Sequence, residues 1–282
     1  FRSLRYDYAE KSLLELTGRY DGSYKFAGMT STRWGFFPSA SVGWNISKED
    51  FMKSLTAIDN LKIRGSVGLL GNDGVSPFMF LSTYSPGGKV VLQDGTAVPS
   101  YYTSGVPNKN LTWEKTLSWN AGYDLSLWNE KLGMEVDAFY NYTYDILTGN
   151  SGGHPASMGG YYETYVNGNA IDSKGIDILI SHKNRFELAG QPFYYEIGAT
   201  ATYSKTRWIR YKDDPNVPEW QKITGTTYGS LWGWLADGLY RSEEEIDNSA
   251  WYGTRPNVGD IKYVDLNGDG LIDWQDRGIF GK

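Results

Sequence analysis

The sequence contains no cysteine, and this absence excludes several kinds of site at once. Disulfide scaffolds, cysteine-ligated zinc, iron–sulfur clusters and cysteine nucleophiles all require a thiol. The chain also has no run approaching the roughly 18–20 consecutive apolar residues that a membrane-spanning helix requires. Its opening residues, Phe-Arg-Ser-Leu-Arg, show no hydrophobic region of a signal peptide. These absences exclude a helical membrane protein.

Basic residues are outnumbered, with 27 Lys and Arg against 33 Asp and Glu, so the formal net charge is −6. No basic stripe is available for a phosphate backbone, and nucleic acid is not expected as a partner. The histidines His154 and His182 form no metal or catalytic pair in the sequence. Residues 149–153 read Gly-Asn-Ser-Gly-Gly, but we do not interpret this glycine-rich stretch as a nucleophile elbow, and no phosphate-binding glycine loop is present. We therefore predict no catalytic residue and no enzyme activity.

Glycine and aromatic residues are abundant, with 34 Gly, 22 Tyr, 11 Trp and 11 Phe in 282 residues. Many strands, tight turns and an aromatic belt at a membrane surface need this composition. A soluble aromatic-rich β-sandwich, such as a carbohydrate-binding module, needs it equally. Composition alone leaves both possibilities open.

Apolar and polar side chains alternate strictly through much of the chain. In the clearest example, Leu132, Met134 and Val136 alternate with Glu135 and Asp137, a period of two that is typical of strands. The pattern recurs in residues 14–21, 39–46, 61–69, 118–127, 176–183 and 195–204. With a further strand near residue 4, we predict eight strands joined as up-and-down hairpins.

Strand length and loop length distinguish a membrane wall from a soluble sandwich. Several segments run ten to fifteen residues, longer than the ~5–6 of soluble strands and close to the ~9–11 that cross a bilayer. Aromatic residues near the strand ends resemble interfacial girdles, namely Trp44, Trp113, Trp128, Tyr140, Tyr142, Tyr144, Tyr203 and Trp208. The fold class predicted is all-β, an antiparallel up-and-down transmembrane β-barrel segment.

The connections alternate between short and long. Short turns are predicted at residues 9–11, 128–131 and 188–192, and a longer one at 47–60 begins a helix capped by Ser47 and Asp50. Long loops are predicted at 22–32, 71–111, 149–170 and after 211. We predict two regions: residues 1–211 hold barrel strands with short periplasmic turns and long extracellular loops, and residues 212–282 form a long acidic, aromatic-rich extracellular loop.

Several sequence blocks stand in an order and spacing typical of one transporter family. They are Arg-Tyr-Asp-Gly-Ser at 19–23, Arg-Trp-Gly-Phe-Phe-Pro-Ser-Ala-Ser-Val-Gly-Trp at 33–44, Ile-Ser-Lys-Glu-Asp-Phe-Met at 46–52, Leu-Lys-Ile-Arg-Gly-Ser-Val-Gly at 61–68, Asn-Leu-Thr-Trp-Glu at 110–114, Asn-Ala-Gly-Tyr-Asp at 120–124, Asn-Gly-Asn at 167–169, Gly-Ile-Asp at 175–177 and Gly-Asp-Ile-Lys-Tyr-Val-Asp at 259–265. Nearly end to end, the chain resembles the SusC/RagA-type TonB-dependent outer-membrane transporters, nutrient importers of Bacteroidetes-like Gram-negative bacteria.

This resemblance implies a barrel of about 22 strands around a plug, located in the bacterial outer membrane and surrounded by membrane lipid. It implies uptake of oligosaccharides or oligopeptides with a SusD-like surface lipoprotein, driven by the TonB complex through parts absent from this chain. Because the sequence opens within a strand and ends after a loop, we expect a middle-to-late portion of the barrel. The alternative is a soluble aromatic-rich β-domain that binds glycans with a calcium-stiffened loop, and its apolar face would cover an interior core.

Residues 265–276 resemble a calcium-binding loop. Oxygen-bearing side chains or a backbone carbonyl occupy loop positions 1, 3, 5, 7, 9 and 12, and Gly270 occupies the sharp turn at position 6. At position 12, the side chain of Asp276 is one methylene shorter than that of the usual glutamate. Oxygen-only ligands suit a hard cation, so we predict a structural Ca²⁺ held by Asp265, Asn267, Asp269, Leu271, Asp273 and Asp276. The alternative is an Asp/Asn/Gly-rich turn without a metal.

Aromatic residues are concentrated after residue 207. Such side chains stack on sugar rings, contact a partner protein, or build the small core of a loop. As a candidate substrate or partner loop we select Trp208, Trp220, Tyr228, Trp232, Trp234, Trp251 and Tyr252.

Overall fold

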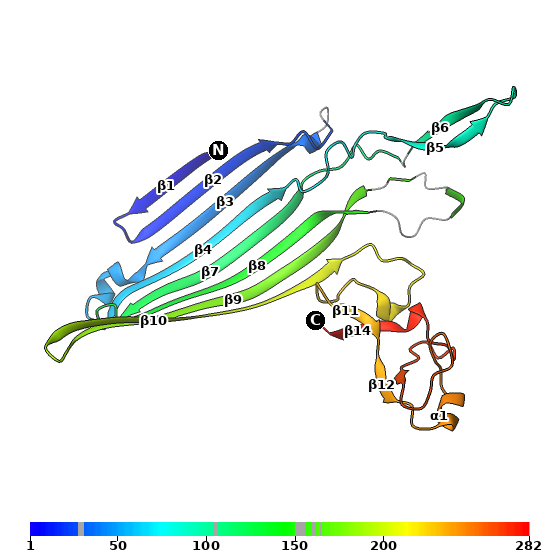
Figure 1. Cartoon of the computed structure of the whole chain (residues 1–282). Helices are drawn as coiled ribbons and strands as arrows, with labels where there is room; N and C mark the ends of the chain where they lie inside the picture. Colours follow the sequence, from blue (N-terminus) through cyan, green and yellow to red (C-terminus); the bar gives the residue numbers. More distant parts are fainter. Residues whose placement is uncertain (28–30, 104–105, 150–155, 159–161, 164, 282) are drawn as a thin grey trace. The chain divides into compact units, whose positions relative to one another are not determined.

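The computed structural model describes residues 1–27, 31–103, 106–149, 156–158, 162–163 and 165–281. Its largest element is a sheet of eight strands in the order β1-β2-β3-β4-β7-β8-β9-β10, paired antiparallel (Figure 1). The strands are β1 (Arg2–Tyr8), β2 (Ser12–Gly22), β3 (Trp34–Asn45), β4 (Ile58–Asn72), β7 (Glu114–Leu127), β8 (Leu132–Gly149), β9 (Tyr165–Leu188) and β10 (Gln191–Arg210). The eight predicted strands and their hairpin order are confirmed.

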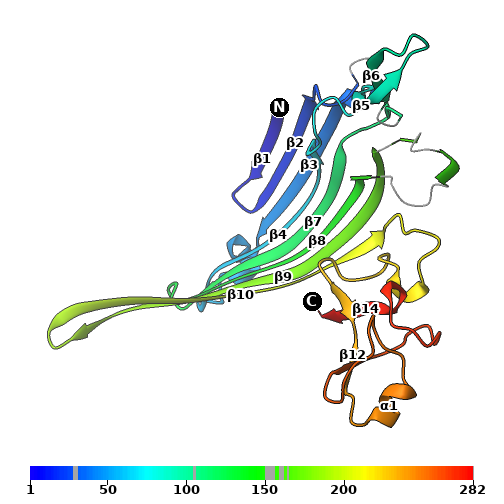
Figure 2. The same cartoon turned by 45° about the vertical axis from the view of Figure 1, so that its right-hand side comes forward.

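This sheet is open and curved. Its two edges are β1 and β10, and the strands bend together in both views (Figures 1 and 2). The strands are long, reaching 18 residues in β8 and 24 in β9. A curved sheet that keeps two edges is an arc of a barrel wall, since closure would pair the edges with each other.

The strand register keeps each face of the sheet chemically uniform. A one-residue slip in any pairing would move a strand's whole apolar set to the other face. One apolar row runs Leu14–Val42–Gly65–Ala121–Ala138–Ile176, and a polar row runs Thr17–Ser39–Gly68–Ser118–Asn141–Ser173. The predicted alternation is therefore confirmed across six neighbouring strands.

Three hairpins close through the short turns that the sequence predicted. Their residues adopt the left-handed backbone region, including Ala9 (φ 51°), Asn129 (φ 57°), Ala189 (φ 52°) and Gly190 (φ 78°). Residues other than glycine are uncommon in this region. Here the tight turns between long strands impose this left-handed conformation.

The connection between β3 and β4 corrects one prediction. It contains two 3₁₀ helices, Ile46–Lys48 and Asp50–Met52, and neither has a side-chain cap. Ser47 Oγ instead donates to Asn60 Oδ1 at 3.5 Å. Glu49 binds Lys11 Nζ at 3.0 Å and Trp44 Nε1 at 3.1 Å. Contacts with the neighbouring strands therefore replace the predicted local cap.

The described residues through Thr206 form one compact unit, and those from Arg207 form a second, here called the C-terminal unit. The first unit also carries a hairpin of β5 (Tyr84–Val91) and β6 (Ala97–Thr103) inside a predicted long loop. The C-terminal unit contains β11 (Leu231–Trp234), β12 (Ala236–Leu239), α1 (Glu243–Asp247), β13 (Ile261–Tyr263) and β14 (Arg277–Gly281). No helix among the described residues has the length and apolar character to cross a membrane.

A small hydrophobic cluster, here called the loop cluster, joins the loops to the sheet. Phe26, Phe37, Leu111 and Trp113 are its buried members. The Trp113 ring centroid lies 5.5 Å from that of Phe26 and 5.3 Å from that of Phe37. Its Nε1 donates to the carbonyl of Arg33 at 3.2 Å. The prediction that Trp113 belongs to an interfacial girdle is therefore wrong, because loop residues pack over its ring.

Candidate functional site in the polar face of the sheet

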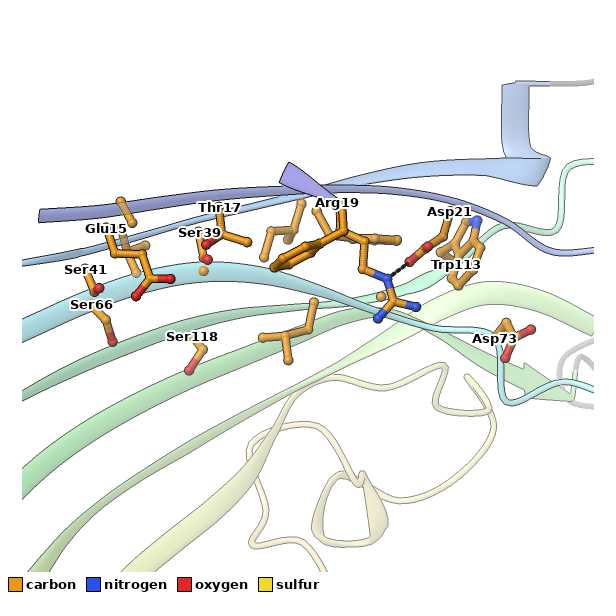
Figure 3. A pocket seen from close by; sticks show the side chains of 18 of the residues that line it. Glu15, Thr17, Arg19, Asp21, Ser39, Ser41, Ser66, Asp73, Trp113 and Ser118 are labelled. Carbon is orange, nitrogen blue, oxygen red and sulfur yellow. Dashed lines mark ion pairs between the residues drawn. The ribbon is translucent and has the colours of Figure 1, made fainter. Parts of the chain in front are cut away.

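The polar face of β2, β3, β4 and β7 carries a hollow of about 820 Å³ (Figure 3). Because side chains of a strand alternate between faces, every second residue of these strands projects into the hollow. Hydroxyl groups line much of it, namely those of Thr17, Ser39, Ser41, Ser66 and Ser118. The hollow therefore offers many neutral donors and acceptors on a surface bent by the curvature of the sheet.

Charged side chains lie toward the loop end of this hollow. Arg19 and Asp21 project from β2 and form an ion pair at 2.5 Å (Figure 3). Asp73, just after β4, accepts a hydrogen bond from Ser23 Oγ at 2.7 Å and lies 3.5 Å from Lys25 Nζ. These contacts hold the segment after β2 against the segment after β4.

The aromatic wall of the hollow depends on two glycines. Phe37 and Trp113 both line the space and are nearly buried. A Cβ on Gly35 would lie 2.3 Å from Phe37 Cζ, and one on Gly71 would lie 2.0 Å from it. Because the Phe37 ring is also packed against Trp113, only glycine fits beside it at these two positions.

An ionic network crosses the polar face in the middle of the strands. Arg64 Nη1 and Nη2 donate to the two oxygens of Asp137, both at 2.6 Å, and its Nε donates to Asp124 at 3.0 Å. A Cβ on Gly122 would lie 2.6 Å from Asp137 Oδ1. Glycine therefore leaves the space in which the forked guanidinium meets its partner.

The opposite face of the sheet is apolar and exposed. Val42 is 57% exposed, Trp119 51% and Ile197 67%. Water-facing strands of soluble sheets carry polar residues at such positions. An apolar surface that extends over neighbouring strands marks contact with a membrane or another protein.

A curved sheet of long antiparallel strands, with a polar hollowed face and an exposed apolar face, is a segment of a transmembrane β-barrel wall. The chain belongs to the family described as TonB dependent receptor-like, beta-barrel, whose sequence model matches residues 3–275. It is similar to the TonB-dependent receptor SusC of Bacteroides thetaiotaomicron (28% identity) and the TonB-dependent receptor P3 of Formosa agariphila (26% identity). Each match covers 100% of this chain and 28% of the relative.

The fold is also similar to solved structures of a peptide importer. The RagAB peptide importer in its "open-open" state matches with a TM-score of 0.72 and 17% identity, over 99% of this chain and 28% of the other. Its "closed-closed" state matches with a TM-score of 0.71 and 17% identity, over 99% and 29%. At 17% identity, this similarity shows that the folds are alike and nothing more. The chain spans 28% of the length of the curated relatives named above.

In the predicted calcium loop, backbone amides engage the side-chain oxygens. Asp265 accepts from Gly268 N at 2.6 Å and from Gly270 N at 2.9 Å. Asn267 accepts from Asp269 N at 3.0 Å, and Asp269 accepts from Leu271 N at 2.9 Å. The first half of the loop is therefore a series of side-chain turns.

The second half of the loop is a helix cap. Asp273 and Asp276 form a capping box around the 3₁₀ helix Trp274–Asp276. Asp276 is fully buried and accepts from Leu266 N and Asp273 N, both at 2.9 Å. Among the described residues, no three Asp, Glu, His or Cys side chains are close enough to hold a metal ion. The donor types suit calcium, and its binding stays a prediction.

Adding calcium to the full-length protein is expected to stabilise the C-terminal unit. At a concentration 100-fold above the dissociation constant, the gain is about 2.7 kcal/mol. The Asp269→Ala variant should lose this gain, because it removes an exposed ligand without touching the buried cap. Thermal unfolding with calcium, magnesium or a chelator measures the effect. Identical midpoints in all three solutions would show a metal-free turn.

The seven selected aromatic residues do not form a single site. Trp208 packs against Tyr228, with ring centroids 5.3 Å apart, and Trp234 packs separately against Tyr252 at 4.7 Å. The others lie elsewhere in the C-terminal unit: Trp220 Nε1 donates to Gln275 O at 2.9 Å, Trp232 pairs with Ile279 between β11 and β14, and Trp251 lies beside Tyr252. Several of these residues therefore build the unit.

Most residues that line the hollows were not predicted from the sequence, and three of them have large side chains or charges that shape these hollows. Phe37 and Asp73 line the polar-face hollow, and Tyr263 lines a smaller hollow in the C-terminal unit. A signal for Phe37 existed, because a large aromatic residue at a polar position of its strand, two residues after Gly35, interrupts the alternation. No comparable signal marks Asp73 or Tyr263.

Proposed function

We propose that this chain forms part of the wall and extracellular loops of a TonB-dependent outer-membrane nutrient importer. The importer takes up oligosaccharides or oligopeptides together with a SusD-like surface lipoprotein. In this proposal the apolar face contacts lipid, and the polar hollow lines the path of the substrate. Hydroxyl and ion-paired side chains there offer hydrogen bonds to a polar substrate.

The observation that carries the proposal is the separation of the two faces through six registered strands. Membrane barrels place apolar residues outward and polar residues inward. Membership of the TonB-dependent receptor-like family supports the class of transporter. The similarity to SusC and to a structure titled as a peptide importer supports nutrient uptake in general. The choice between sugars and peptides is left to experiment.

Deleting the full-length gene in its bacterium tests this proposal. Growth on at least one oligosaccharide or peptide, supplied as the only carbon source, is expected to stop, while growth on the corresponding monomer continues. A tagged full-length protein is expected to copurify with a surface lipoprotein, identified by mass spectrometry. Unchanged growth on every oligosaccharide and peptide, without a copurifying lipoprotein, would contradict the proposal.

A soluble glycan-binding β-domain is the second candidate, and the exposed apolar face argues against it. That candidate requires the apolar residues to cover an interior core. In the described residues, the loop cluster lies on the polar side through Phe37, and Val42, Trp119 and Ile197 remain exposed on the other side. Extraction of the native protein without detergent would revive this candidate.

A further inference from the structure

The C-terminal unit contains its own hollow of about 390 Å³ beside β13. It is lined by four aromatic residues, Tyr240, Trp251, Tyr252 and Tyr263, and by polar residues that include Arg255, Asn257 and Asp260. Backbone hydrogen bonds hold its walls: Tyr240 N donates to Asp260 O at 3.0 Å, and Ile272 N donates to Trp251 O at 3.3 Å. The walls are therefore shaped before any ligand arrives, as ligand pockets usually are.

Three of the four aromatic residues of this hollow differ from other aromatic residues of the unit in the partners of their polar atoms. Outside the hollow, Trp220 and Trp234 donate their ring N–H groups to the carbonyls of Gln275 and Asp273 at 2.9 and 2.7 Å. In the wall of the hollow, the Tyr240 hydroxyl donates to Ala250 O at 2.8 Å. By contrast, within the described part of the chain, Trp251 Nε1 and the hydroxyls of Tyr252 and Tyr263 have no hydrogen-bond partner. Trp251 and Tyr263 are half-buried, and buried Trp and Tyr side chains usually find such a partner, whereas Tyr252 is exposed.

The hollow offers little net charge to a ligand. Arg255 donates to Asp247 Oδ1 at 2.6 Å and to Glu243 Oε2 at 2.8 Å. These hydrogen bonds raise the pKa of Arg255 and commit its charge to the helix α1. Asp260 uses one carboxylate oxygen to accept from Asn257 N at 2.8 Å. Its other oxygen and the side-chain amide of Asn257 have no partner among the described residues.

We propose that this hollow binds one neutral sugar residue of a glycan. Aromatic faces suit the C–H face of a pyranose ring, and unpartnered N–H, O–H and carboxylate groups around them suit its hydroxyls. Among the described residues that line the hollow, the basic residue is Arg255, and its ion pairs with Glu243 and Asp247 disfavour an anionic ligand. The inference rests on the proposed function and deepens it, because it selects oligosaccharides as the substrate class and gives the C-terminal unit a part in capture.

Titration of the full-length protein with neutral hexasaccharides of glucose, mannose, xylose and galactose tests the inference. The detergent must lack a sugar head group, and calorimetry or tryptophan fluorescence reports binding. At least one hexasaccharide is expected to bind. The Tyr252→Ala variant should weaken that binding by about tenfold or more, as expected for a central aromatic contact.

The matched control is Phe280→Ala. Phe280 is 58% exposed and Tyr252 is 55% exposed, and both belong to the C-terminal unit. The control should change affinity by less than about twofold, as for a surface residue away from a site. Asn257→Ala, which removes an exposed amide, provides a second variant if Tyr252→Ala fails to fold.

Three outcomes would overturn the inference: none of the four hexasaccharides binds, the Tyr252→Ala and Phe280→Ala variants bind equally well, or only hexapeptides displace the bound hexasaccharide. Its failure is distinguishable from failure of the proposed function. If growth depends on the gene but sugar binding does not depend on Tyr252, the sugar site is contradicted and the proposed importer function stands. If growth on every oligosaccharide and peptide is independent of the gene, the proposed importer function itself is contradicted.

Discussion

Replacing Trp113 with alanine is expected to destabilise the loop cluster by about 3–5 kcal/mol, the usual cost of removing a large buried aromatic side chain. The ring contacts Phe26 and Phe37, and its N–H donates a hydrogen bond to the carbonyl of Arg33. The variant therefore leaves a cavity and removes one of two hydrogen bonds to this carbonyl, which Ser23 N keeps at 3.1 Å. Because each 1.4 kcal/mol is a factor of ten, local opening should increase by more than about a hundredfold.

Limited trypsin digestion of the full-length protein in detergent measures this opening. Cleavage at Lys25, Arg33 and Lys109 is expected to accelerate, since proteolysis follows the population of the open form. The matched control is Trp34→Ala, which removes an exposed tryptophan that stacks on Tyr20 at 5.3 Å. Equal cleavage of the Trp113 variant and the wild type would show that the cluster does not hold the loops.

Replacing Arg64 with methionine is expected to cost about 1.5–3 kcal/mol, the range for hydrogen bonds to charged groups. The change leaves Asp124 and Asp137 without their cation. Asp137 also stands opposite Asp177 in the β8–β9 register, and like charges in that position repel. Denaturant unfolding of the full-length protein in detergent should show a lower midpoint, and adding Asp137→Asn should recover part of the loss.

Arg5→Met is the control for Arg64→Met. Arg5 binds Glu15 at 3.0 Å on the same face, but its side chain is 78% exposed, against 32% for Arg64. An exposed ion pair contributes less than about 1 kcal/mol, so this control should barely shift the midpoint. If both variants shifted it equally, the mid-strand network would have no special importance.

Alternation was enough to predict the faces of the sheet. A strand places successive side chains on opposite faces whatever its neighbours are, so Met134, Val136 and Ala138 share a face by geometry alone. The capping prediction at Ser47 and the girdle prediction for Trp113 failed because both used local signals. In each case residues distant in the chain, such as Lys11 for Glu49 and Phe26 for Trp113, supply the decisive contacts.

The sequence by itself determined the strand class, the two faces and the family, because these follow from a short-range period and from ordered motifs. Only the tertiary structure decided which residues meet. Arg64 and Asp137 are separated by 73 positions and become neighbours through the pairing of β4, β7 and β8. The hollow beside Tyr252 likewise depends on backbone hydrogen bonds that join Tyr240 to Asp260 and Ile272 to Trp251. Such contacts depend on strand register and loop closure, which no local pattern of residue types specifies.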